Sequence, residues 1–119
     1  MRNIHHFISG SALESSSDRF GDVFDPNTGG VQARVGLGTS AELDQAVASA
    51  VAAQVGWAAT NPQRRARVMF EFKRLLEAHM DELAHLLSSE HGKVIADSRG
   101  DVQRGLEVIE FACGIPHLL

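Results

Sequence analysis

The sequence is poor in cysteine and lacks a long apolar run. A single cysteine, Cys113, excludes an internal disulfide and a metal site built from a cysteine cluster. Such sparing use of cysteine is typical of a reducing compartment. No apolar run approaches the roughly 18 residues of a membrane span, and the first residues lack the apolar stretch of a secretory signal. We therefore expect a cytoplasmic protein that does not cross a membrane.

The sequence also lacks an excess of positive charge. Eleven Lys and Arg residues stand against 15 Asp and Glu residues, giving a formal net charge of -4. This balance argues against nucleic acid or an anionic membrane as a partner. The 119 residues, 44% of them hydrophobic, are enough for one globular domain or a piece of a larger one. The apolar ending, residues 114–119, favours a truncated chain.

Strand signals concentrate in residues 1–38. Residues 4–8 and 12–14 flank a turn that contains serine and glycine, which predicts a short hairpin. Residues 21–25 and 31–35 flank a second turn, built from proline, asparagine, threonine and glycine. Two short hairpins are not stable alone in water, so we expect this region to pack on something else.

Helical periodicity begins at Thr39. The segment from Thr39 to Glu42 fits a capping box, and the apolar residues that follow form one stripe. Gly56 and the segment Thr60-Asn61-Pro62 are the signals expected to end this helix. A second helix begins at Pro62, after the cap residue Asn61, and extends to Gly92, with a bend or break expected near residues 79–81.

A last helix is expected over residues 95–112, and it contains Gly100 and Gly105. Glycine inside a helix usually admits a close neighbour or a ligand. The predicted fold is therefore α+β: an N-terminal β-hairpin region over residues 1–38, followed by a helical segment of three to four helices over residues 39–119.

The polar motifs predict no catalytic or metal residue. His79, His85 and His91 recur every six residues, so successive rings point about 120° apart on a helix and cannot share one ion. Cys113 lies late in a helix among apolar residues, where burial in the core is favoured over a reactive thiolate.

A dinucleotide-binding motif is not predicted either. Gly36-Leu37-Gly38 has the beginning of G-x-G-x-x-G, but Ala41 replaces the third glycine and no βαβ unit surrounds it. A turn between a strand and a helix is the favoured interpretation, and no cofactor-binding residue is assigned.

Arg104 has two interpretations. Asp101 three residues before it and Glu107 three residues after it would form a surface ladder of ion pairs. Alternatively, the adjacent Gly105 lets the guanidinium reach a bound carboxylate with two parallel hydrogen bonds. Spacing alone favours the ladder.

Four segments resemble a known family. Phe24–Gly29, Ala58–Arg67 and Glu90–Lys93 resemble the N-terminal region of the aldehyde dehydrogenase superfamily. The run Gly100–Pro116, with its Arg-Gly-x-Glu-x-x-Glu-Phe-Ala core, more specifically resembles the methylmalonate-semialdehyde dehydrogenase (CoA-acylating) branch. The resemblance covers nearly the whole chain, from about residue 6 to residue 119.

The resemblance implies the opening portion of the α/β cofactor-binding domain of an NAD-dependent enzyme. In that family a cysteine later in the chain attacks the aldehyde, hydride passes to NAD, and the thioester is passed to coenzyme A with loss of carbon dioxide. It implies that Arg104 helps to hold the substrate carboxylate, which favours substrate recognition over the ladder, although both can hold together.

The same resemblance implies that NAD and coenzyme A serve the full-length enzyme and that this segment binds neither and is inactive alone. Its partners would be the remainder of its own chain and further copies, in a dimer or tetramer. Two alternatives remain: a non-catalytic helical interaction or oligomerisation module, and the N-terminal part of a general aldehyde dehydrogenase. The general aldehyde dehydrogenase is favoured if Arg104 only forms a surface ion pair.

Overall fold

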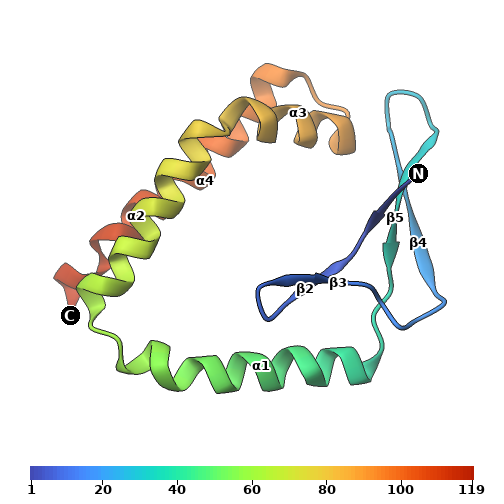
Figure 1. Ribbon diagram of the computed structural model, residues 1–119. Helices are drawn as coiled ribbons and strands as arrows, with labels where there is room; N and C mark the ends of the chain where they lie inside the picture. Colours follow the sequence, from blue (N-terminus) through green and yellow to red (C-terminus); the bar gives the residue numbers. More distant parts are fainter. The chain divides into compact units, whose positions relative to one another are not determined.

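The computed structural model describes residues 1–119 and divides them into two compact units (Figure 1). The first unit, Met1–Trp57, contains all five strands and most of the first helix, and the second, Ala58–Leu119, is helical. The change from strand to helix predicted at residues 38–39 is found at the start of helix α1 (Ser40–Ala59). The division between compact units is a different boundary, because α1 lies mainly with the strands.

A three-stranded sheet forms the larger part of the first unit. Its order is β1 (Arg2–Ile4), β5 (Val31–Gly36) and β4 (Phe20–Phe24). β4 and β5 pair antiparallel, as predicted, and Ala33 at the centre of β5 is fully buried. β1 pairs parallel with β5, which the sequence did not predict. A strand of three residues is too short for its alternation of apolar and polar side chains to be recognised.

The first predicted hairpin is confirmed in shorter form. The segment expected as one strand over residues 4–8 is interrupted at His5, so that only β2 (His6–Ile8) pairs antiparallel with β3 (Ser11–Leu13). The two turn residues, Ser9 and Gly10, both have positive φ angles, of 55° and 79°. Two successive residues in the left-handed region are typical of the turns whose twist matches that of a hairpin.

Helix α1 begins where the capping box predicts and ends directly before Thr60, the second of the two predicted stop signals. It continues through Gly56, the first of these signals, to Ala59. A glycine costs about 1 kcal/mol in a helix relative to alanine, which is too little to end one. The apolar residues of its stripe are more than half exposed: Leu43, Val47, Val51 and Val55.

The second unit follows the predicted start and stop signals closely. Helix α2 (Pro62–Ala78) begins after Asn61, whose side chain accepts a hydrogen bond from the backbone N–H of Gln63. The predicted break occurs at His79, and α3 (Met80–His91) ends at Gly92, which has a φ of 86°. Helix α4 (Ile95–Gly114) then extends two residues beyond its expected end into a short 3-10 turn, η1 (Ile115–Leu118).

Helix α4 runs back along α2 and also packs against α3 (Figure 1). Small residues dominate the buried positions of this unit: Ala66, Ala84, Ser88, Ser98 and Cys113. Small side chains allow helices to approach closely, and Leu106 is the one large residue among the buried positions of α4. The predicted burial of Cys113 is confirmed. None of the helices has the length and hydropathy that a membrane span requires.

Candidate functional site

Arg104 lies on the exposed face of α4. Its side chain is 70% exposed, and its Nη2 atom lies 3.6 Å from Oδ1 of Asp101, one helical turn earlier. The predicted pairing with Asp101 is therefore present. Glu107, the other predicted partner, instead accepts a long hydrogen bond of 3.4 Å from Gln103. Because 3.6 Å exceeds a hydrogen-bond distance, Arg104 is attracted to Asp101 without donating to it.

A second cation, Lys93, approaches the other oxygen of the same carboxylate. Lys93 lies in the connection between α3 and α4, and its Nζ atom donates to Oδ2 of Asp101. This hydrogen bond is the main cause of the lowered pKa of Asp101, and the charges of Lys93 and Arg104 lower it further. Sequence reasoning missed Lys93 at this site, because no helical spacing relates it to Arg104. We call Lys93, Asp101 and Arg104 the carboxylate cluster.

The corner between α3 and α4 fixes the position of Lys93. Gly92 ends α3 in the left-handed conformation, and its N–H donates to the carbonyl of Ser88. The Oγ atoms of Ser88 and Ser98 form a buried hydrogen bond of 2.7 Å between the two helices. On the surface, the guanidinium of Arg99 in α4 donates to the carboxylate of Asp81 in α3. These contacts hold the two helix ends together around the connection.

The carboxylate cluster carries two positive charges against one negative charge. A guanidinium presents its donors in a planar fork that matches a carboxylate, and the structure records no hydrogen bond from the Arg104 guanidinium to the chain. The cluster can therefore attract an anion and bind it at the exposed end.

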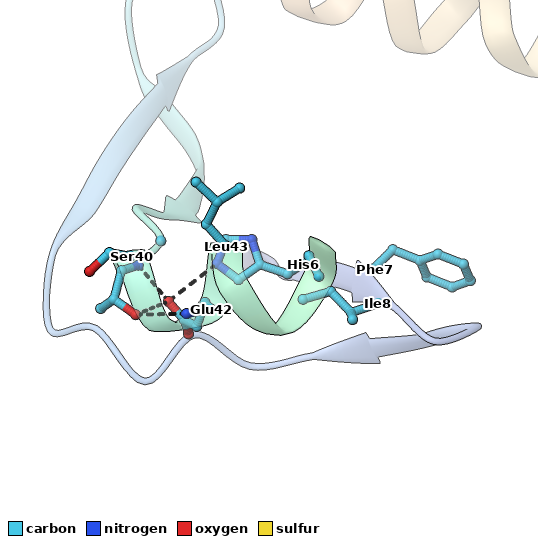
Figure 2. A pocket seen from close by; sticks show the side chains of 9 residues that line it. His6, Phe7, Ile8, Ser40, Glu42 and Leu43 are labelled. Atoms are coloured by element: carbon cyan, nitrogen blue, oxygen red, sulfur yellow. Dashed lines mark hydrogen bonds and ion pairs between the residues drawn. The ribbon is translucent and has the colours of Figure 1, made fainter. Parts of the chain in front are cut away.

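A groove of about 470 Å³ lies in the first unit between β2 and the start of α1 (Figure 2). Its polar side is formed by the carboxylate of Glu42, which is only 7% exposed. The backbone N–H groups of Thr39 and Ser16 donate to this carboxylate over 2.7 and 2.6 Å. The hydroxyls of Ser15, Ser16 and Thr39 donate to it as well. The predicted capping box is confirmed and has become part of a larger anchor.

These donors keep Glu42 ionised. The backbone N–H of Thr39, followed by that of Ser16, lowers its pKa from 4.5 to about 2, against the opposing effect of burial. The imidazole of His6 lies on the same side of the groove, with Nε2 buried, without a hydrogen-bond partner, and 3.9 Å from Oε2 of Glu42 (Figure 2). The side chain of Phe7 points away from His6 and Glu42 (Figure 2). The carboxylate is fully used in joining the segment at residues 15–16 to the start of α1.

The segment Gly36–Gly38 does not fit the phosphates of a dinucleotide. A helix N-terminus attracts phosphate through its unpaired N–H groups, but here the buried carboxylate of Glu42 accepts from the Thr39 N–H at that end. The ring of His6 also covers Gly38, where an added Cβ would lie 3.4 Å from Nε2. The interpretation of this segment as a turn between strand and helix is confirmed by its position between β5 and α1.

The remaining sequence candidates do not come together. Among the three histidines, the ring of His79 pairs with Glu82, with Nδ1 2.9 Å from Oε2, and the structure holds no group of three or more residues of metal-ligating type. Apart from the neighbouring residues and backbone of its own helix, no atom lies within 4 Å of an added Cβ at Gly105, whereas one at Gly100 would meet only Nη2 of Arg104, at 4.0 Å.

Comparison with known proteins places these elements in a family. A model of the aldehyde dehydrogenase family matches residues 13–119. The malonate-semialdehyde dehydrogenase of Listeria innocua serovar 6a is 44% identical over all 119 residues, which make up 24% of that protein. Malonate-semialdehyde dehydrogenase 3 of Geobacillus kaustophilus is 45% identical over 118 residues, with 99% of this chain and 24% of the relative covered.

Solved structures show the same relationship. A crystal structure described as a methylmalonate-semialdehyde dehydrogenase from Sinorhizobium meliloti 1021 in complex with NAD has a TM-score of 0.96 and 55% identity, covering 99% of this chain and 24% of that one. The methylmalonate-semialdehyde dehydrogenase of Oceanimonas doudoroffii also has a TM-score of 0.96, at 43% identity, covering 100% and 24%. The predicted α+β fold is confirmed, and the chain spans about a quarter of the length of these relatives.

Proposed function

Because this chain belongs to the aldehyde dehydrogenase family, we propose that it is the N-terminal part of an NAD-dependent, CoA-acylating dehydrogenase of methylmalonate or malonate semialdehyde. The observation that supports this most is the identity of 55% to a methylmalonate-semialdehyde dehydrogenase over 99% of the chain. An aldehyde dehydrogenase whose name gives no particular substrate, that of Brucella melitensis biovar abortus 2308, matches at a lower identity of 26%.

In this proposal Arg104 binds the carboxylate of the semialdehyde. The substrate differs from a simple aldehyde in carrying a carboxylate, and a guanidinium with free donors is the side chain best suited to bind one. Arg104 meets that requirement, since its side chain is 70% exposed and its attraction to Asp101 uses none of its donors. Its role is to bind and orient the substrate, and it does not take part in bond formation.

The chemical step belongs to other residues of the complete enzyme. Cys113 is buried, so we assign it no catalytic role. The segment at Gly36–Gly38 does not fit a dinucleotide phosphate, for the reasons given above. We therefore propose that NAD and coenzyme A bind outside residues 1–119 and that these residues alone have no dehydrogenase activity. The reducing cytoplasm, expected from the single cysteine, completes the proposal.

The test compares substrates with and without the carboxylate. In the complete enzyme carrying these residues, Arg104→Ala should raise the KM for methylmalonate semialdehyde by roughly 10- to 150-fold, the value of one hydrogen bond to a charged group. The KM for propanal should not change. Arg74→Ala is a matched control, because Arg74 is also exposed and pairs with an acidic residue three positions before it, but it lies in α2 and outside the carboxylate cluster. An equal effect on both aldehydes would favour a general aldehyde dehydrogenase.

A second candidate, a non-catalytic interaction module, is favoured by one observation. Val47, Val51 and Val55 on α1 are more than half exposed, and exposed apolar faces commonly mark contacts with another chain or segment. In the dehydrogenase proposal this face packs against the remainder of the polypeptide or against further copies in a dimer or tetramer. Sedimentation of residues 1–119 alone, compared with the complete enzyme, distinguishes the two: a module should form the same stable oligomer in both forms.

A further inference from the structure

The carboxylate cluster contains one acidic side chain at a place where the proposed substrate is itself an anion. Asp101 therefore works against substrate binding by simple charge, and its presence beside Arg104 needs an explanation. The explanation rests on the proposed function, since it concerns the residue that binds the substrate carboxylate.

The two oxygens of Asp101 have separate cations. Oδ2 accepts a hydrogen bond from Lys93, whereas Oδ1 faces Nη2 of Arg104 at 3.6 Å. Lys93 comes from outside the helix, so it sets the direction of the carboxylate independently of α4. A carboxylate held at one oxygen cannot rotate to form a bidentate pair with the guanidinium, which would use the donors that the substrate requires.

Exposure changes in order through the cluster. The side chain of Lys93 is 23% exposed, that of Asp101 40% and that of Arg104 70%. The inner ion pair is therefore the better shielded from solvent and the better ordered, because exposed charges are screened by water and salt. Arg104 at the outer end remains accessible to a ligand.

The backbone also leaves a defined place for the guanidinium. Long side chains on a helix lean toward its N-terminus, and that of Arg104 lies back over the preceding turn, where a Cβ added to Gly100 would be 4.0 Å from Nη2. Glycine at position 100 thus leaves room for the guanidinium over this turn, and the Asp101 carboxylate lies beside it at 3.6 Å.

From this geometry we infer that Asp101, held by Lys93, is a positioning residue that orients the guanidinium of Arg104 for the substrate carboxylate. Asp101 does not touch the substrate. It holds Arg104 by long-range attraction and leaves its hydrogen-bond donors available.

The substitution Asp101→Asn tests this inference by the sign of its effect. If Asp101 acted only through its charge, its loss would strengthen the attraction for an anionic substrate, and the KM for methylmalonate semialdehyde would fall. If Asp101 positions Arg104, that KM should rise roughly threefold to tenfold, between the effect of an exposed ion pair and that of a buried supporting contact. The KM for propanal should stay unchanged, because propanal has no carboxylate for Arg104 to bind.

The measurements use the complete enzyme that carries residues 1–119, or a chimera in which these residues replace the matching quarter of the Sinorhizobium meliloti protein. Glu71→Gln is the control, because it removes an exposed carboxylate that pairs with an arginine three positions later, in α2 and outside the carboxylate cluster. Asp101→Glu keeps the charge, so the KM for methylmalonate semialdehyde should rise less than in Asp101→Asn. Circular dichroism of each variant separates a loss of folding from a change in KM.

The outcomes separate the inference from the proposed function. If the unsubstituted enzyme does not oxidise a semialdehyde, or Arg104→Ala affects both aldehydes equally, the proposed function fails and the inference fails with it. If Arg104→Ala raises the KM selectively but Asp101→Asn lowers it or leaves it unchanged, only the inference is overturned. Both the proposed function and the inference are supported if Arg104→Ala and Asp101→Asn each raise the KM for methylmalonate semialdehyde alone and Asp101→Glu raises it less than Asp101→Asn.

Discussion

Replacing Ser98 by alanine should lower the free energy of unfolding of the second unit by about 1 to 2 kcal/mol. Ser98 is fully buried in α4, and its Oγ lies 2.7 Å from Oγ of Ser88 in α3. This distance is the preferred length of a hydrogen bond between hydroxyls. Removing one hydroxyl leaves the other buried without this partner, and burial prevents water from taking its place. A bond from the remaining hydroxyl to a carbonyl of its own helix would keep the loss near the lower value.

The matched variants are Ser88→Ala and the double variant S88A/S98A. The double variant should lose about 1 kcal/mol less than the sum of the two single losses, because it leaves no buried hydroxyl unsatisfied. The free energies of unfolding of all three variants are measured by urea unfolding monitored by far-ultraviolet circular dichroism. They can be compared if the slope of the free energy of unfolding against urea concentration is the same in each. If the loss in the double variant equals the sum of the two single losses within about 0.3 kcal/mol, the hydrogen bond does not couple the helices, and our reasoning about this corner is wrong.

Three further substitutions are predicted from the structure. Acid should weaken the attachment of α1, because Glu42 has a pKa of about 2 in the fold against an ordinary 4.5. Its contribution to stability is complete above about pH 4.5 and is lost as the pH falls toward 2. In a pH series of thermal unfolding, the unsubstituted chain should therefore lose more stability over this range than Glu42→Gln, in which only the other carboxylates titrate. Gly92→Ala should destabilise the second unit by about 1 kcal/mol, because residue 92 has a φ of 86°. Gly105→Ala should stabilise the same unit by up to about 1 kcal/mol, because residue 105 lies within α4 and an added Cβ would meet no atom outside its own helix within 4 Å. Urea unfolding of both glycine variants tests whether the free energy of unfolding falls in Gly92→Ala and rises in Gly105→Ala. A loss of stability in Gly105→Ala would contradict the open space around this residue.

Local signals predicted most of the second unit. Asn61 before Pro62, the break at His79 and Gly92 after the last turn each depend on one or two residues and their own backbone, so they are readable from the sequence. The errors lie where the local signal was weak. Gly56 costs α1 too little to end it, and β1 is visible only through its pairing with a strand almost thirty residues later.

The anchor around Glu42 was predictable only in half. The reciprocal hydrogen bonds between Thr39 and Glu42 follow from a spacing of three residues. The donors at Ser15 and Ser16 come from a connector more than twenty residues earlier, and nothing in its composition indicates which acid it approaches. The lowered pKa of Glu42 depends on both sets of donors. The sequence therefore predicts the cap but not how far the pKa is lowered.

The same limit explains why spacing alone could not decide between the two neighbours of Arg104. Asp101 and Glu107 lie three residues to either side and are equivalent to a rule that counts positions. A helix is not symmetrical, however: the side chain of Arg104 leans toward the N-terminus and hence toward Asp101. Lys93 then holds that carboxylate from outside the helix. The direction of the helix therefore selects the ion pair, and a residue outside the helical pattern leaves the arginine free to bind a ligand.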